Sequence, residues 1–140
     1  MSKWFRLEEF LDSSVARQKG ISNSPSWEIV ERLGMLATFL DDVRDKWGSG
    51  IKISSGFRNE KLNAAVGGVK NSNHLWGWCA DIQPVNGKLD EFARFLKDYL
   101  KDKGFDECIF ETKGKTRWIH FALMNANGGQ RRKMFNLTVK

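Results

Sequence analysis

The stretch that decides the fold runs from Ser54 to Gln83 and reads SSGFRNEKLNAAVGGVKNSNHLWGWCADIQ. It contains His74, one of only two histidines in the 140 residues, and the carboxylate of Asp81 follows seven residues later. The other histidine, His120, lies within WIHF (118–121), a segment that reads as a β-strand. Two imidazoles and one carboxylate are three of the ligands that a catalytic zinc ion takes, with a fourth position left for water. We therefore expect the chain to bring these three side chains to one point.

Length and composition indicate one globular domain covering residues 1–140. The apolar fraction of 41% and the six tryptophans are enough to build a core. No apolar run approaches the roughly 18 residues of a membrane span, and the N-terminus lacks the apolar core of a secretory signal. We expect a monomer that is synthesised in the cytoplasm without a signal peptide and does not insert into a membrane.

The net charge indicates which binding partners to expect, and the cysteine content indicates whether disulfides or thiol ligands are expected. The net charge of +6 suits an anionic partner, but the basic residues are spread out and no nucleic-acid recognition motif accompanies them, so we expect no nucleic-acid partner. Cys79 and Cys108 form no CxxC pair and are expected to be buried free thiols. Because Cys79 lies two residues before Asp81, it is kept as an alternative zinc ligand.

Hydrophobic periodicity predicts several helices. A short helix is expected over 7–11, followed by a polar loop through Asn23. A long amphipathic helix begins at Ser24-Pro25 and ends at Gly48, with apolar residues at alternating spacings of four and three. A two-turn helix is expected over 59–65, and a second amphipathic helix begins after Asn86-Gly87 and ends at Gly104.

Short alternating segments predict the strands. Strands are expected at 51–54, 79–83, 108–111 and 118–123, with a hairpin loop at 112–117 and a final strand over 134–139. The expected fold class is therefore α+β, a small antiparallel sheet packed against amphipathic helices.

Alternation along two of these strands places metal-capable side chains on the face away from the core. Over 118–123, the apolar residues at 119, 121 and 123 share the buried face, so His120 projects from the other face. Over 79–83, Ala80 and Ile82 are buried while Asp81 projects. Each strand thus offers one candidate ligand to a cleft on the same side of the sheet.

Several motifs occur in order along the chain: Ser55-Gly56-Phe57-Arg58, Leu62-Asn63, Val66-Gly67-Gly68, Ser72-Asn73-His74, Gly77 and Ala80-Asp81-Ile82. Together they resemble the signature of zinc D-Ala-D-Ala carboxypeptidases and related peptidoglycan peptidases, a group that shares its fold with the Hedgehog signalling domain. The similarity extends from about Phe5 to Leu123 and includes features of small phage and bacterial members. The resemblance implies a Hedgehog/DD-peptidase-like fold.

The resemblance also implies the roles of the site residues. His74, Asp81 and His120 would hold Zn²⁺, and a water molecule activated by zinc would be the nucleophile. Arg58 would hold a carboxylate or carbonyl oxygen of the substrate, a task that suits a planar guanidinium. Ser72 would either hydrogen-bond the substrate or support the loop.

The general base departs from the family pattern. Many relatives carry an acid or a histidine three residues before the last zinc histidine, where this chain has Arg117, which cannot accept a proton. A hairpin register that pairs Glu111 with Trp118 and Ile109 with His120 would place Glu111 diagonally beside His120. We therefore predict that Glu111 is the catalytic base.

The resulting functional hypothesis is zinc-dependent hydrolysis of peptide bonds in the stem peptides of peptidoglycan, by a D,D-carboxypeptidase or an endopeptidase. By analogy with phage members, an endolysin-like enzyme would act at the cell wall after lysis-associated release or from a virion. The alternative hypothesis is a catalytically inactive zinc-bearing binding domain of the same fold. The arginine at position 117 favours that alternative.

Overall fold

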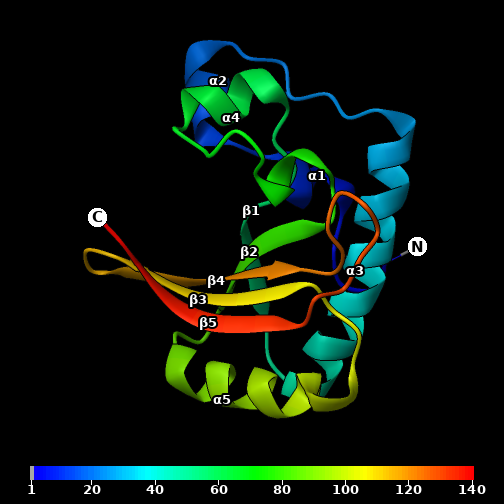
Figure 1. The fold of residues 1–140 in the computed structure, drawn as a ribbon, viewed down its shortest axis with the longest axis vertical. Helices are drawn as coiled ribbons and strands as arrows, with labels where there is room; N and C mark the ends of the chain where they lie inside the picture. Colours follow the sequence, from blue (N-terminus) through cyan, green and yellow to red (C-terminus); the bar gives the residue numbers. More distant parts are fainter. Residues whose placement is uncertain (1) are drawn as a thin grey trace.

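A five-stranded sheet with strand order β1-β2-β4-β3-β5 forms the centre of the computed structural model, which describes residues 2–140 (Figure 1). Neighbouring strands are antiparallel, except that β5 runs parallel to β3. The strands are β1 (Ile51–Ser55), β2 (Cys79–Pro84), β3 (Glu107–Lys113), β4 (Thr116–Ala122) and β5 (Lys133–Val139). The α+β class is confirmed.

The parallel β5 corrects the expectation of a purely antiparallel sheet. Strand β4 ends where β3 begins, because Ala122 pairs with Glu107. The chain then turns back through residues 123–132 and starts β5 beside the same end, where Lys133 pairs with Glu107. Strand β5 must therefore run in the direction of β3 along its free edge. The hairpin is also tighter than predicted, since β3 and β4 extend to Lys113 and Thr116.

The helices lie on both sides of the sheet (Figure 1). Helix α5 (Leu89–Tyr99) covers one face, and the long α3 (Trp27–Trp47) runs along one end of the sheet. Helices α1 (Leu7–Leu11), α2 (Ser14–Lys19) and α4 (Glu60–Ala65) gather beyond the other face, and the 3₁₀ turns are η1 (Asn73–Leu75) and η2 (Leu100–Asp102). None of the helices among residues 2–140 has the length and apolar character needed to cross a membrane.

Two helix boundaries differ from the prediction. Residues 14–19 form α2 rather than a loop, because the Ser13 hydroxyl accepts from the Ala16 N–H and Gly20 ends the helix at φ 64°. Only Ala16 is buried in this helix, so no apolar stripe marks it in the sequence. Helix α3 begins two residues later than predicted, since Ser26 rather than Ser24 caps it by accepting from the Ile29 N–H.

The core lies between the sheet, α3 and α5. The predicted apolar stripe of α3 is buried, with Leu33, Leu36 and Leu40 at most 1% exposed. Ala80 and Ile82 of β2 face this core together with Phe121 of β4. Because side chains alternate along a strand, the opposite face of the sheet is left to carry polar groups. That polar face lies toward α1, α2 and α4.

Candidate metal centre

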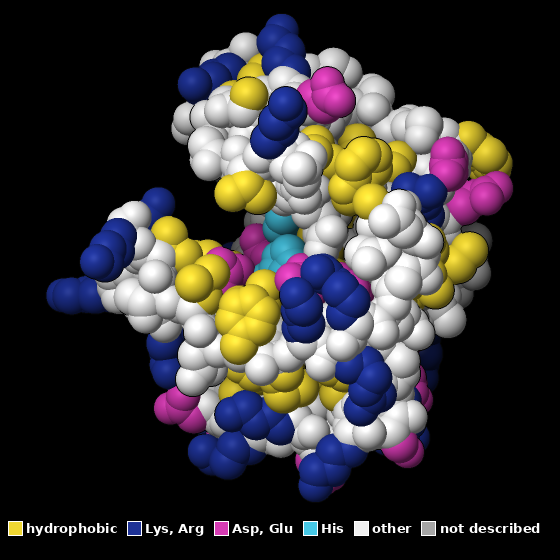
Figure 2. Space-filling model, viewed as in Figure 1, with side chains coloured by type: hydrophobic (Ala, Val, Ile, Leu, Met, Phe, Trp, Pro, Cys, Tyr) yellow, Lys and Arg dark blue, Asp and Glu magenta, His cyan; other side chains and the backbone are white. Residues whose placement is uncertain are grey.

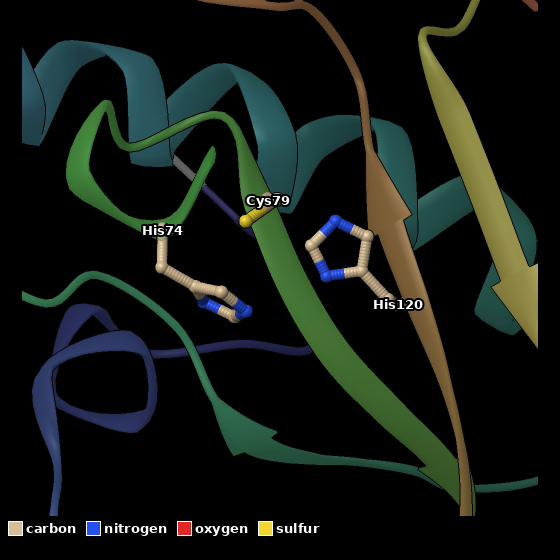
Figure 3. A group of neighbouring side chains, drawn as sticks. All are labelled: His74, Cys79 and His120. Atoms are coloured by element: carbon tan, nitrogen blue, oxygen red, sulfur yellow. The ribbon is translucent and has the colours of Figure 1, made fainter. Parts of the chain in front are cut away.

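His74, Asp81 and His120 meet on the polar face of the sheet. Asp81 and His120 are direct partners across β2 and β4, and His74 lies in η1, immediately before β2. The Asp81 Oδ1 atom is 3.2 Å from His120 Nδ1 and 3.4 Å from His74 Nε2. Both imidazoles are buried, at 3% and 8% exposure, and their ring centroids are 5.2 Å apart (Figure 3). The structure thus brings together the three residues that the sequence indicated.

The ring of His74 is fixed in a metal-binding tautomer. Its Nδ1 lies 2.6 Å from the carbonyl oxygen of Gly56, which can only accept, so Nδ1 carries the proton and donates it. Nε2 faces Asp81 at 3.4 Å and is the nitrogen that would bind a metal ion. A Cβ on Gly56 would lie 2.4 Å from the carbonyl oxygen of Phe10, so only glycine brings this backbone close enough.

Electrostatics couple the carboxylate and the imidazoles. Burial alone would raise the pKa of Asp81, but the charge of His74 and hydrogen bonds from both histidines hold that pKa well below its usual range. Burial alone would lower the pKa of His120. Hydrogen bonds to Asp81 and Glu107 outweigh this effect and raise the pKa to about 9. His120 therefore holds a proton at neutral pH that a bound cation would displace. Two imidazoles and an ionised carboxylate are a donor set that fits zinc.

Cys79 also lies at this point, at the start of β2. Its Sγ atom is within 4.8 Å of a ring nitrogen of His74 and of His120 (Figure 3). The thiol is fully buried, and this burial raises its pKa well above the usual range. Because the thiolate is the form that binds metals, the ionised Asp81 is the better third ligand than the protonated Cys79.

Glu111 lies beside the cluster, as the predicted hairpin register required. That register is confirmed: Glu111 pairs with Trp118, and Ile109 pairs with His120. Single ligand atoms of Glu111, Asp81 and His120 all lie within 4.8 Å of one another. The indole Nε1 of Trp118 donates to Glu111 Oε2 at 3.1 Å. Burial and the charge of Asp81 raise the pKa of Glu111, which makes it a stronger base than an exposed glutamate.

Arg117 does not take part in the cluster. Residues three apart on a strand face opposite sides of the sheet, so Arg117 projects away from His120. Its Nη1 atom donates to Asp90 Oδ1 at 2.8 Å, at the start of α5 on the far face. Position 117, where many relatives carry an acid or a histidine, is therefore occupied here by a residue that lies outside the cluster.

Arg58 and Ser72 support the segment that carries His74. The backbone N–H of Arg58 donates to the carbonyl oxygen of His74 at 3.0 Å, and its Nη2 atom donates to Ser72 Oγ at 3.3 Å. The same hydroxyl accepts from the His74 N–H at 3.2 Å, so Ser72 holds the loop. The buried Nε–H of Arg58 has no hydrogen-bond partner within residues 2–140.

Glu107 is a residue of the site that sequence reasoning missed. Its Oε1 atom lies 3.5 Å from His120 Nε2 and accepts from Asn73 Nδ2 at 2.7 Å. Strand parity could have found it, because residues 107, 109 and 111 of β3 share one face. The sequence alone did not show that this end of β3 also reaches His120.

The cluster lies in a cleft of about 640 Å³. Figure 2 shows the two histidines at the bottom of a hollow between the upper part of the molecule, which holds α2 and α4, and the sheet below it. Basic side chains line this cleft at Arg58, Lys113 and Arg131, and apolar ones at Ile109, Leu137 and Val139. A cleft of this volume is within the range of ligand-binding sites.

Comparison of the chain with known proteins identifies its family. The sequence model of the family described as peptidase M15 matches residues 3–122, a range that includes the whole cluster and Glu111 but not β5. A search of curated proteins found no match to the chain. M15 peptidases are generally zinc-dependent, and this chain has groups of side chains that could hold a metal ion. The chain belongs to the peptidase M15 family.

Proposed function

We propose that this peptidase is a zinc enzyme that hydrolyses peptide bonds in the stem peptides of peptidoglycan, as a D,D-carboxypeptidase or a stem endopeptidase. The observation that carries the proposal is the meeting of His74 Nε2, His120 Nδ1 and Asp81 beside Glu111 in an open cleft. The stem peptide as substrate, and action at the cell wall after lysis or from a virion, rest on the resemblance to peptidoglycan peptidases.

The side chains divide the chemistry between them. Zinc held by His74, Asp81 and His120 would polarise the scissile carbonyl and lower the pKa of a water molecule. Glu111 accepts the proton that this water loses and delivers it to the amine that leaves, which is general base and then general acid catalysis. Its pKa is raised by burial and by the charge of Asp81, so Glu111 holds the accepted proton more firmly than an exposed glutamate would.

Arg58 supplies the binding of the substrate's oxygen atoms. It lines the cleft beside His74 and Ser72. A planar guanidinium with free donors binds a carboxylate through two parallel hydrogen bonds. In a carboxypeptidase this group would be the C-terminal carboxylate of the stem, and in an endopeptidase it would be a backbone carbonyl oxygen.

Mass spectrometry of fragments released from purified peptidoglycan, with and without a chelator, tests this proposal. Chelator-sensitive release of a single terminal alanine would identify a carboxypeptidase, and release of a larger stem piece an endopeptidase. An Asp81→Ala variant is the matched control and should release nothing. Zinc-loaded, folded protein that releases no product from several wall types would contradict the proposal and support an inactive binding domain.

A further inference from the structure

Glu107 joins three separate segments of the chain. Its side chain is 15% exposed at the start of β3. One carboxylate oxygen accepts from Asn73, the neighbour of His74, and faces His120 Nε2 at 3.5 Å. The other oxygen lies 3.6 Å from Nη2 of Arg131, just before β5. Glu107 therefore lies between the loop of one candidate ligand and the ring of another.

Arg131 is itself held rigidly. Its Nε and Nη2 atoms each donate to a different oxygen of Asp106 at 2.8 Å, and its backbone N–H donates to Asp106 Oδ1 at 3.1 Å. Asp106 is fully buried. This two-pronged geometry fixes the plane of the guanidinium as well as its position. Arg131 is thus a fixed cation beside Glu107, and it lies outside the residues matched by the family model.

The neighbouring Arg132 has an unusual backbone conformation, and its side chain binds a different part of the chain from that of Arg131. Arg132 has a φ of 56°, in the left-handed region, which is uncommon for a residue other than glycine. Its Nη2 atom donates to the carbonyl oxygen of Lys101 at 2.9 Å, within η2. Consecutive arginines therefore reach two different targets, and only Arg131 reaches Glu107.

A histidine that binds a metal through one nitrogen is normally oriented through the other. The second N–H donates to a carboxylate or carbonyl, which fixes the tautomer and the rotation of the ring. For His74 the partner is the carbonyl oxygen of Gly56. For His120, Nδ1 faces Asp81, so the orienting partner must lie at Nε2, where Glu107 lies.

We propose that Glu107 is a positioning residue for His120, and that Asp106 and Arg131 hold Glu107 in place. Glu107 accepts the Nε2 proton of His120, so that the lone pair of Nδ1 faces the metal position shared with His74 and Asp81. The inference rests on the proposed function only in taking this cluster as a zinc site. It assigns part of the metal centre to a segment beyond the family match, through Arg131.

Zinc affinity, measured by competition with a chromophoric chelator, tests the proposal. Glu107→Ala should weaken zinc binding by about 10–100-fold, as expected for the loss of a carboxylate that orients a ligand. Glu107→Gln keeps an acceptor oxygen and should recover part of the affinity, and Arg131→Gln should show a smaller loss than Glu107→Ala. Arg132→Gln removes the same charge one residue away and is the matched control, which should bind zinc like the wild type.

The ring of His120 gives a second readout that a general loss of stability would not produce. In the zinc-loaded wild type, nitrogen-15 NMR should show a proton on Nε2 and none on Nδ1. In Glu107→Ala the Nε2 proton should exchange faster with water. Folded Glu107→Ala and Arg131→Gln proteins with wild-type zinc affinity would overturn the proposal.

The same measurements separate this inference from the proposed function. A wild type that binds zinc but cleaves no peptidoglycan would contradict the proposed function and leave the role of Glu107 to be decided by the affinities. A wild type that does not bind zinc would overturn both. Loss of affinity in Arg132→Gln equal to that in Arg131→Gln would also overturn the proposal, because a general loss of charge would then explain the effect.

Discussion

At the scale of single residues, the proposed proton transfer depends on Glu111. It lies within 4.8 Å of Asp81 and His120, yet Trp118 rather than the cluster provides its hydrogen bond. Glu111→Gln should therefore keep zinc affinity and lose roughly 10²–10⁴-fold in kcat, the usual contribution of a positioned base. Zinc titration and stem-peptide turnover measured on the same preparation would check both parts, and near-normal turnover would rule out Glu111 as the base.

The pH dependence gives Glu111 a separate signature. Its pKa is raised above the usual 4.5, so the carboxylate becomes protonated, and the base is lost, at a higher pH than for an exposed glutamate. The activity of the wild type should therefore fall on acidification above that usual value. Residual activity of Glu111→Gln should lack this acidic limb, and a limb that persists unchanged would assign it to another group.

Substitution of Arg117 tests whether the residue three positions before His120 affects catalysis. Arg117 faces α5 and pairs with Asp90 on the far side of the sheet. We expect Arg117→Ala to leave kcat/KM on a stem peptide unchanged, because the substitution touches neither cleft nor cluster. Arg58→Ala is the contrasting variant and should raise KM. A large loss of activity in Arg117→Ala would mean that the substrate extends over the hairpin.

At the scale of elements, β5 is attached to the domain through the start of β3. The backbone N–H of Lys133 donates to the carbonyl oxygen of Asp106, and the Asp106 carboxylate accepts three hydrogen bonds from Arg131. This attachment lets β5 bring Leu137 and Val139 to the wall of the cleft. The edge strand therefore contributes to the site as well as to the sheet.

Asp106→Asn should lower the free energy of unfolding by about 1–3 kcal/mol at neutral pH, since a buried charge-assisted pair is lost. Hydrogen bonds from Arg131 hold the pKa of Asp106 below 3.8, its usual value. The carboxylate's contribution is therefore complete above that unfolded-state value and is lost as the pH falls through the lower folded-state value. Urea denaturation of both proteins at pH 7 and at successively lower pH should show the difference shrinking, whereas a constant difference would refute this account.

At the scale of the whole molecule, a metal at the cluster would join η1, β2 and β4. Binding to the folded state alone stabilises it in proportion to the logarithm of the free ligand concentration. At zinc about 100-fold above the dissociation constant, the gain is ~2.7 kcal/mol, or roughly 5–10 °C in Tm. Thermal denaturation with zinc and with a chelator would measure it, and a His74→Ala His120→Ala variant should show no difference. An equal zinc effect in that variant would place the metal elsewhere.

The amino-acid sequence by itself determined the class of the fold and which side chains are candidate ligands. Apolar spacing located α3 and α5, and alternation put Asp81 and His120 on the non-core face. The hairpin register that pairs Ile109 with His120 also followed from the sequence. These features are local: side-chain period and turn length decide them within a few residues.

Only the tertiary structure decided how that site is supported. The Gly56 carbonyl oxygen that fixes His74 lies 18 residues away along the chain, and Arg131 reaches Asp106 across 25. The parallel pairing of β5 with β3 depends on the path of the whole chain, as does the ion pair between Arg117 and Asp90 of α5. Strand alternation places Glu107 on the same face as Glu111. Contacts between distant residues leave no periodic trace in a single sequence, so the partners of Glu107 became visible only when the strands were assembled.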